Sequence, residues 1–263
     1  MSQDATTTAT TPTPPQPAPQ PAARPQGAPQ AAGGPPVQRQ MVNFAFYKLD
    51  PAFRRLSDHD KLQARSEFLK VVSQRRDGLI ALTYSTVGLR PDSDFLLWRI
   101  AASTDAFQEQ TKAINKTRLG GYLTTPWSFV SMTKRSMYVD KLDPFHTPES
   151  RTHIIPGKRK YLFVYPFVKT RDWYLLPLEQ RQAIMDVHIK VGNKYPSVKL
   201  NTTYSFGLDD QDFVVAFETD EAKDFLDLVM DLRETQSSKF TQRDTPIFTC
   251  VQMPIENVLD QLF

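Results

Sequence analysis

Four histidines are the side chains of this sequence most suited to acid–base or metal chemistry. His59 stands in a polar run typical of a solvated helix start, and His146 and His153 stand in a proline-containing connection. His188 lies within an apolar helical pattern. A side chain there is predicted to point into the protein, so His188 is the histidine of most interest.

The helix around His188 decides which way its imidazole points. Ile184, Met185, His188 and Val191 are spaced at i, i+1, i+4 and i+7, which places all four on one helix face. This spacing alone favours a core histidine bonded to a backbone carbonyl. A neutral imidazole in apolar surroundings is also what an axial haem ligand requires. Both interpretations remain open at this point.

The most unusual stretch is 165–174, which reads YPFVKTRDWY. It ends an apolar run and puts oxidisable tyrosine and tryptophan side chains beside lysine and arginine, which bind carboxylates well. An edge strand with amphipathic side chains is the plain structural alternative. The sequence has no HExxH, paired cysteines, GxGxxG or P-loop, so common metal sites and nucleotide-dependent enzymes are not expected. Asp209-Asp210 is expected to be a turn rather than an acid–base pair.

The elements that must position these residues are predicted to follow the order β-α-β-β-α-β twice. Ser57 with Asp60 resembles a capping box at the first helix start, and Gly78 ends that helix. In the first half, strands are expected at 41–47, 79–86, 94–101 and 127–138, with a second helix at 104–119. In the second half, strands are expected at 161–168, 198–205, 212–218 and 247–253, with helices at 178–191 and 221–234.

Local sequence supports a duplication. DFLL at 94–97 matches DFVV at 212–215, and Thr-Pro at 125–126 matches Thr-Pro at 245–246, shifted by 118 and 120 positions. Chance similarity of two α+β stretches is the alternative. We expect an α+β protein of two ferredoxin-like halves, which would give a pair of antiparallel sheets with helices outside. The expected division is a tail at 1–40, a first half at 41–140, a linker at 141–160 and a second half at 161–263.

Composition limits the class of protein. Ten of the 21 prolines lie in the first 40 residues, which contain no aromatic residue, so this tail is predicted to be disordered. The single cysteine, Cys250, excludes an intramolecular disulfide framework, and no apolar run is long enough to span a bilayer. No secretory signal is evident, and a net charge of +3 does not indicate nucleic acid. A cytoplasmic protein is therefore expected.

A larger set of motifs in the second half forms a recognisable pattern. It consists of Tyr165-Pro166-Phe167-Val168-Lys169, Trp173-Tyr174, Leu176-Pro177, Arg181, His188, Ser205-Phe206-Gly207-Leu208-Asp209-Asp210, Leu232-Arg233-Glu234 and Ser238. With these motifs the sequence resembles the chlorite dismutase-like haem protein superfamily over nearly all of 41–253. The resemblance implies a duplicated dimeric α+β barrel, usually assembled as a ring of five subunits, with the haem site in the second half.

The resemblance implies roles for individual residues. His188 falls at the proximal haem ligand, Trp173 at the tryptophan packed beside it, and Lys169 at a basic residue that contacts a propionate. Chlorite dismutases depend on a distal arginine, and here Leu200 or Asn201 takes that place. This difference argues against efficient chlorite decomposition.

The amino-acid sequence of these motifs most resembles that of the coproheme decarboxylases of the actinobacterial type. These enzymes use hydrogen peroxide to remove carbon dioxide from two propionates of iron coproporphyrin III, giving haem b. Their tyrosine falls at Tyr165, which would become a radical and take a hydrogen from the propionate β-carbon. His153, or alternatively His146, falls at a distal base. Arg233 and Ser238 match positions near the propionates.

Three functions therefore follow as expectations. The first is a coproheme decarboxylase, supplied with its substrate by a ferrochelatase. The second is another haem enzyme of the same fold, with peroxidase or chlorite activity. The third is a non-catalytic haem-binding or transfer protein. Tyr165 favours the first of these over the others.

Overall fold

The computed structural model describes residues 38–136, 138 and 153–263. Residues Pro36–Phe263 form one compact unit. The tail at 1–37 and most of the linker, including His146, lie outside the described residues, so the disorder predicted for the tail is not tested.

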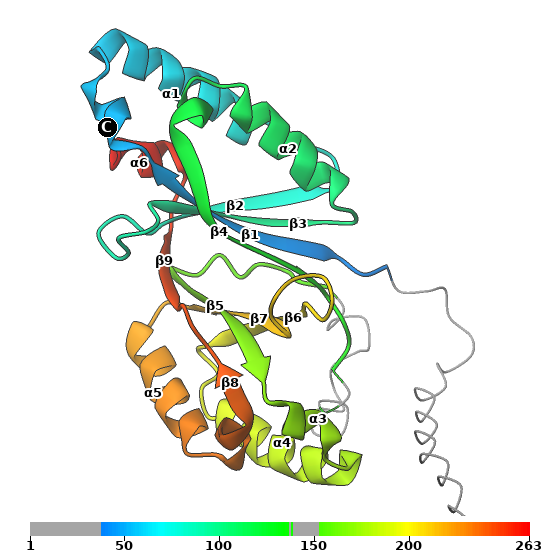
Figure 1. Cartoon of the computed structure of the whole chain (residues 1–263). Helices are drawn as coiled ribbons and strands as arrows, with labels where there is room; N and C mark the ends of the chain where they lie inside the picture. The colour runs from blue at the N-terminus through cyan, green and yellow to red at the C-terminus, as the bar shows by residue number, and fades with distance from the viewer. Residues whose placement is uncertain (1–37, 137, 139–152) are drawn as a thin grey trace, which may run out of the picture. The chain divides into compact units, whose positions relative to one another are not determined.

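The first half packs helices against one face of a four-stranded antiparallel sheet (Figure 1). Strand β1 is central and pairs with both β3 and β4, while β2 pairs with β3. Ser57 caps α1 as predicted, because its side chain accepts a hydrogen bond from the backbone N–H of Asp60 and donates to the Asp60 carboxylate. The elements are β1 (Met41–Leu49), η1 (Pro51–Arg55), α1 (Asp58–Val72), β2 (Leu79–Ser85), β3 (Phe95–Ala101), α2 (Asp105–Asn115), η2 (Leu119–Tyr122) and β4 (Leu123–Met132).

The second half repeats this order and adds short elements that the sequence did not predict. Strand β5 pairs with β7 on one side and with β8 and β9 on the other. The elements are β5 (Tyr161–Lys169), α3 (Arg171–Leu175), α4 (Leu178–Gly192), β6 (Lys199–Tyr204), β7 (Phe213–Thr219), α5 (Ala222–Arg233), η4 (Gln236–Phe240), β8 (Thr241–Arg243), β9 (Phe248–Gln252) and α6 (Ile255–Asp260).

The predicted α+β class is confirmed, and two local expectations are wrong. The stretch 165–174 is not one edge strand: its first part ends β5, which pairs with β7 up to Phe167 and with β8 at Val168 and Lys169, and its last part belongs to α3. The strand predicted at 127–138 begins earlier, at Leu123, and ends at Met132. Pro126, predicted to lie just before this strand, is inside β4, where the pairing with β1 has a register shift between Phe46 and Lys48. Such a shift removes the need for the N–H that proline lacks.

The strand pairings connect the two halves. They run in the order β7-β6-β4-β1-β3-β2-β9-β5-β8, and the additional pairing of β7 with β5 joins β7, at one end of this series, back to β5. The links between the halves are short: Met132 pairs with Tyr204, and β2 pairs with β9 at two positions.

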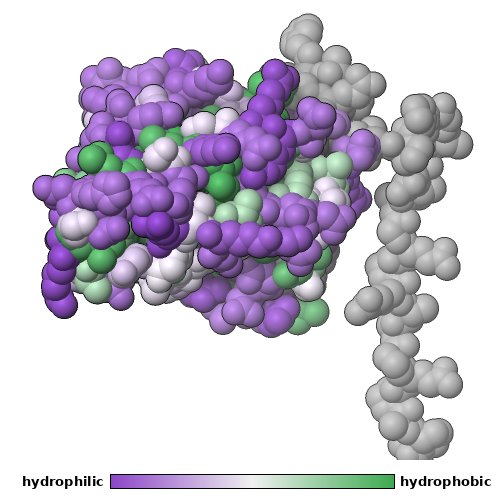
Figure 2. All heavy atoms as spheres, turned by 90° about the horizontal axis from the view of Figure 1, so that it is seen from above, coloured by the Kyte–Doolittle hydropathy of each residue, from purple (hydrophilic) through white to green (hydrophobic). Residues whose placement is uncertain are grey.

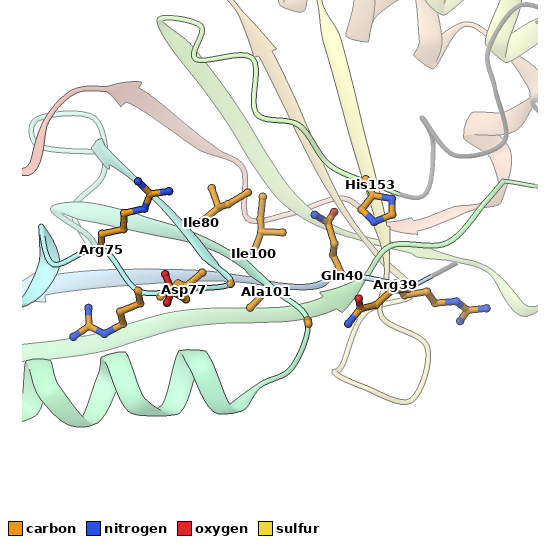
Figure 3. A pocket seen from close by; sticks show the side chains of 13 residues that line it. Arg39, Gln40, Arg75, Asp77, Ile80, Ile100, Ala101 and His153 are labelled. Carbon is orange, nitrogen blue, oxygen red and sulfur yellow. The ribbon is translucent and has the colours of Figure 1, made fainter. Parts of the chain in front are cut away.

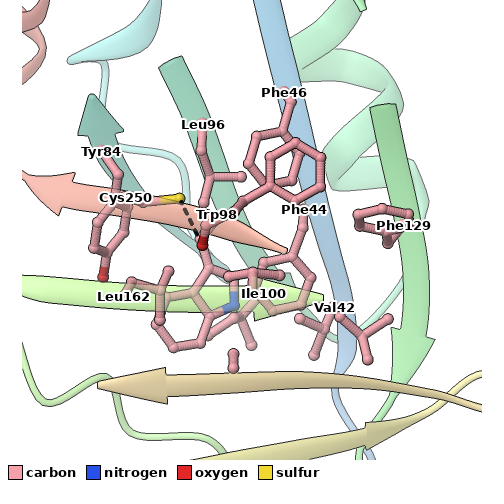
Figure 4. Close-up of a cluster of buried hydrophobic side chains, with 14 of the residues drawn as sticks. Val42, Phe44, Phe46, Tyr84, Leu96, Trp98, Ile100, Phe129, Leu162 and Cys250 are labelled. Atoms are coloured by element: carbon pink, nitrogen blue, oxygen red, sulfur yellow. Dashed lines mark hydrogen bonds between the residues drawn. The ribbon is translucent and has the colours of Figure 1, made fainter. Parts of the chain in front are cut away.

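A large apolar core lies between the sheets of the two halves (Figure 4). Phe46 from the first half stacks on Phe248 from the second, with ring centroids 3.9 Å apart. Phe44 and Trp98 stack at 5.5 Å in the same core, and Cys250 is fully buried there. Because aromatic side chains bury large apolar areas, this core is a main source of stability holding the halves together.

The duplication extends to individual hydrogen bonds. The Asp94 carboxylate accepts the backbone N–H of Leu49 at the end of β1, at 2.8 Å. The Asp212 carboxylate accepts the backbone N–H of Lys169 at the end of β5, at 2.9 Å. Each aspartate thus closes the end of the first strand of its own half, so the aspartates of DFLL and DFVV have the same structural role.

The surface of the protein is largely polar on the side that Figure 2 shows. Polar residues cover most of the face in Figure 2, and apolar residues form small separate groups on it. Within the part of the chain that the structure describes, no helix combines the length and the apolar character needed to cross a bilayer.

Candidate functional site

The side of the second sheet that faces α4 and α5 carries the residues singled out in the sequence. Cross-strand neighbours share a face, and Tyr165 pairs with Val215 while Leu200 pairs with Phe217. Tyr165 and Phe217 stack with centroids 6.1 Å apart. Tyr165, Leu200 and Phe217 therefore line one helix-facing surface.

In the first half, apolar side chains from the helices cover the corresponding face of the sheet more completely. Helix α1 buries Ala64, Phe68 and Val72, and α6 adds three further apolar side chains to that cluster. Helix α4 buries only Ile184. The face beneath α4 is therefore less closely packed than the face beneath α1, as expected of a face that receives a ligand.

Each site residue of the second half can be compared with the residue 120 positions earlier, at the equivalent place in the first half. The first-half positions are apolar and belong to its buried cluster. The second-half positions carry hydroxyl, ammonium, indole and imidazole groups. The pairs are Ala45 and Tyr165, Leu49 and Lys169, Phe53 and Trp173, and Phe68 and His188.

His188 projects a neutral imidazole into this region. Burial, together with the nearby charge of Lys169, lowers the pKa of His188 to about 4. Its Nδ1 atom is buried and has no hydrogen-bond partner among the described residues. The backbone carbonyl expected for a core histidine is thus not bonded to Nδ1, and a neutral ring with a spare lone pair suits an iron ligand.

The depressed pKa of His188 predicts a pH dependence of apoprotein stability. Unfolded histidine takes up a proton near pH 6.5, whereas folded His188 resists protonation until about pH 4. The free energy of unfolding should therefore fall as pH drops from 6.5 to 4, by roughly 2–3 kcal/mol from this residue. Urea titrations of His188→Asn should lack this part of the slope, and His59→Asn, at an exposed site, should keep it. Equal slopes for the wild type and His188→Asn would contradict the assignment.

Lys169 is buried and already has partners. Its ammonium donates to the carbonyl oxygen and to the hydroxyl of Ser237, both at 2.9 Å, and lies 4.7 Å from the centre of the Trp173 ring. Burial lowers its pKa to about 8. Sequence reasoning named Ser238 and missed Ser237. The Ser238 hydroxyl lies 2.7 Å from the Arg233 carbonyl and stabilises the end of α5.

Trp173 is held by contacts from distant parts of the chain. Its ring packs on Phe240, with centroids 5.4 Å apart, and edge-to-face on Tyr138, at 6.4 Å. The Tyr138 hydroxyl bonds to Arg181, and burial raises the Tyr138 pKa. Sequence reasoning missed Tyr138 because it lies outside the motifs and reaches the site only through the fold.

Tyr165 is buried at 8% exposure, and a charged pair lies nearby. Burial raises its pKa most, the charge of Asp244 raises it further, and Arg233 partly offsets both, so the phenol is neutral. Arg233 pairs with Asp244 at 3.3 Å, yet its side chain remains 62% exposed. Its guanidinium can therefore still bind an anion that approaches from solvent.

The strand register distinguishes Leu200 from Asn201. Leu200 shares the face of Phe217 and is 52% exposed. Asn201 points to the opposite face, where its amide donates to Glu218 at 2.9 Å. Glu218 is fully buried and also accepts the backbone N–H of Gly157. Leu200, and not Asn201, lies on the face of Tyr165.

This difference predicts that substitution of Asn201 lowers the free energy of unfolding more than substitution of Leu200. Asn201→Ala should destabilise the protein by about 2 kcal/mol, because buried Glu218 loses a donor. Leu200→Ala should cost less than about 1 kcal/mol, because the side chain is half exposed. Urea unfolding of both variants measures the two values. A larger loss for Leu200→Ala would mean that the register is wrong.

His153 lies elsewhere in the described structure. It is exposed and lines a pocket of about 370 Å³ whose other residues belong to the first half and the residues before it, among them Arg39, Gln40, Arg75 and Ile80 (Figure 3). Tyr165, Lys169 and His188 are not among the residues that line it. No group of three or more metal-ligating side chains occurs among the described residues.

The fold is that of solved chlorite dismutases. The structure is similar to a mutant of the chlorite dismutase from Candidatus Nitrospira defluvii, with a TM-score of 0.76 and 27% identity over 84% of this chain and 94% of that chain. It is also similar to that dismutase in complex with imidazole, with a TM-score of 0.75, 27% identity and the same coverage. These similarities define the class as proteins of the chlorite dismutase fold.

Sequence comparison identifies the family. Residues 61–253 match the family described as chlorite dismutase. A coproheme decarboxylase of Mycolicibacterium smegmatis is 32% identical over 205 residues, which cover 77% of this chain and 85% of that protein. The chain belongs to the chlorite dismutase family, as the resemblance predicted.

Proposed function

We propose that this protein is a coproheme decarboxylase, which uses hydrogen peroxide to convert two propionates of iron coproporphyrin III into vinyl groups and so forms haem b. The observation that carries the proposal is the helix-facing surface of the second half, where Tyr165 and Leu200 line the sheet beneath the helix of His188. The curated relative from Mycolicibacterium smegmatis supports it.

The residues present fit an iron porphyrin. His188 offers a neutral imidazole to the iron, and Trp173 packs next to Lys169 on the same side. The exposed guanidinium of Arg233 suits a propionate carboxylate. The Lys169 ammonium could bind a propionate only after it breaks its hydrogen bonds to Ser237. Arg233 is therefore the better placed of the two cations.

The chemistry assigned to Tyr165 follows from its surroundings. The bound iron supplies an oxidant when it reacts with peroxide. Tyr165, buried and neutral, keeps its phenolic hydrogen until it is oxidised, and surrounding apolar side chains keep bulk water away. Tyr165, once oxidised to a radical, would take a hydrogen atom from the propionate β-carbon. Loss of carbon dioxide and of one further electron, which the oxidised iron centre would accept, would leave a vinyl group. The same residue then serves the second propionate.

Several finer features belong to the proposal. A distal histidine would act as base for peroxide, with His153 and His146 as the candidates. We propose that the ring of strand pairings is the dimeric α+β barrel of the superfamily, and that five subunits assemble. A cytoplasmic location and delivery of coproheme by a ferrochelatase follow from the resemblance.

Chlorite decomposition is the second candidate, favoured by the family match. Leu200 stands on the face of Tyr165 where chlorite dismutases are expected to carry arginine, which weighs against it. The two functions separate in paired assays on protein loaded with coproheme. We expect carbon dioxide release with peroxide and little oxygen release with chlorite. Rapid oxygen release without carbon dioxide would favour the second candidate.

A further inference from the structure

Asp212 ties the end of β5 to the end of α3. Its backbone N–H donates to the carbonyl of Phe167 at 3.2 Å, and its carboxylate oxygen Oδ2 accepts the backbone N–H of Lys169 at 2.9 Å. The same oxygen accepts the hydroxyl of Tyr174 at 2.7 Å. One carboxylate thus fixes the chain at two points, five residues apart.

The segment between these two points carries side chains of the site. It contains Lys169 itself and Trp173, and the ammonium of the first lies 4.7 Å from the ring centre of the second. Helix α3 has only five residues, Arg171–Leu175. So short a helix has little stability of its own and depends on tertiary contacts for its position. The bond from Tyr174 is such a contact.

The first half shows which of these bonds the fold itself requires. The Asp94 backbone N–H donates to the Tyr47 carbonyl at 2.8 Å, and its Oδ2 accepts the Leu49 N–H at 2.8 Å. Its other carboxylate oxygen accepts the ammonium of Lys48. The position 120 residues before Tyr174 is Arg54, which is exposed. The strand-end bonds are therefore common to both halves, whereas the phenol bond occurs in the half that carries the site.

The Tyr174–Asp212 bond is a strong one. Burial raises the pKa of Tyr174, and its hydrogen bond to Asp212 raises it further, so the phenol stays protonated and donates to a carboxylate. Bonds of this kind are stronger than those between neutral groups. The Tyr174 ring also packs edge-to-face on Phe206, with centroids 5.6 Å apart, which limits its rotation.

We propose that Tyr174 and Asp212 form a positioning pair that sets Trp173 and Lys169 against His188. Neither residue of the pair is assigned contact with the porphyrin. The proposal rests on the proposed role of His188 as iron ligand, but its first test does not require a porphyrin.

The first test uses hydrogen exchange of the apoprotein, followed by mass spectrometry. Tyr174→Phe should speed amide exchange in residues 170–176 by about tenfold, as expected for the loss of one charge-assisted hydrogen bond, and should leave the first half unchanged. Tyr122→Phe is the matched control, because Tyr122 packs edge-to-face on Phe53, the counterpart of Trp173. Unchanged exchange in residues 170–176, or an equal rise over the whole chain, overturns the proposal.

The second test separates positioning from a purely structural role. Ferric haem b is added to the wild type, Tyr174→Phe and Asp212→Asn, and its electron paramagnetic resonance spectrum is recorded. Tyr174→Phe should broaden or shift the wild-type signal. Asp212→Asn, which keeps an oxygen acceptor for Tyr174, should stay closer to the wild type. Faster local exchange with an unchanged signal overturns the positioning role. Failure of the wild type to bind haem instead refutes the proposed function, while the exchange test still stands.

Discussion

Tyr165→Phe should bind coproheme nearly as well as the wild type and should lose decarboxylation, by at least about 100-fold in the rate of the chemical step. The variant keeps the buried ring that stacks on Phe217 and removes only the hydroxyl that the proposed chemistry requires. Affinity should stay within about threefold, because at most one neutral hydrogen bond is lost. Optical titration gives the affinity, and chromatography of the porphyrin products gives the rate.

The matched control for this variant is Tyr161→Phe. Tyr161 lies on β5 four residues earlier, so its side chain is on the same face of the sheet. It should retain wild-type turnover. Normal turnover by Tyr165→Phe would show that the radical is formed elsewhere, and equal losses in both variants would point to altered packing of β5.

His188→Ala should lose the protein ligand of the iron. The expected result is weaker coproheme binding, by about 100-fold or more, with a changed Soret band. The imidazole is removed from a buried position, so the cavity it leaves can admit free imidazole. Added imidazole should therefore restore most of the wild-type absorption spectrum.

The control for His188→Ala is His59→Ala, since His59 is exposed near the start of α1. Its coproheme spectrum should match that of the wild type. If His188→Ala kept the wild-type Soret band and affinity without imidazole, the iron ligand would have to be another residue, and the helix-facing surface would lose its main support as the binding site.

Much of the fold could be predicted because it depends on local periodicity. Alternation of apolar residues located β1, a near-continuous apolar run located β5, and the 3.6-residue period located α4 with His188 on its apolar face. The start of β4 was predicted after Pro126, at Trp127, whereas a register shift against the neighbouring strand lets proline lie inside the ladder. Shifts of this kind depend on the partner strand and leave little signal in the strand itself.

The site was less predictable, because its contacts join distant parts of the chain. A gap of one residue left Leu200 and Asn201 equivalent in sequence, and only the pairing of β6 with β7 shows which one shares the face of Tyr165. The adjacent serines posed the same difficulty: Ser237 bonds to Lys169, and Ser238 instead caps α5. Both distinctions depend on side-chain direction, which sequence spacing in a short irregular segment does not fix.

The most direct test of the proposed function is the identity of the porphyrin products. Coproheme-loaded protein is titrated with hydrogen peroxide, and the porphyrin is analysed by mass spectrometry after each addition. The proposed function predicts that a three-propionate intermediate first accumulates and then declines, while haem b, with two remaining propionates, accumulates. Coproheme that stays bound and unchanged, or is bleached without loss of any carboxyl group, would contradict it.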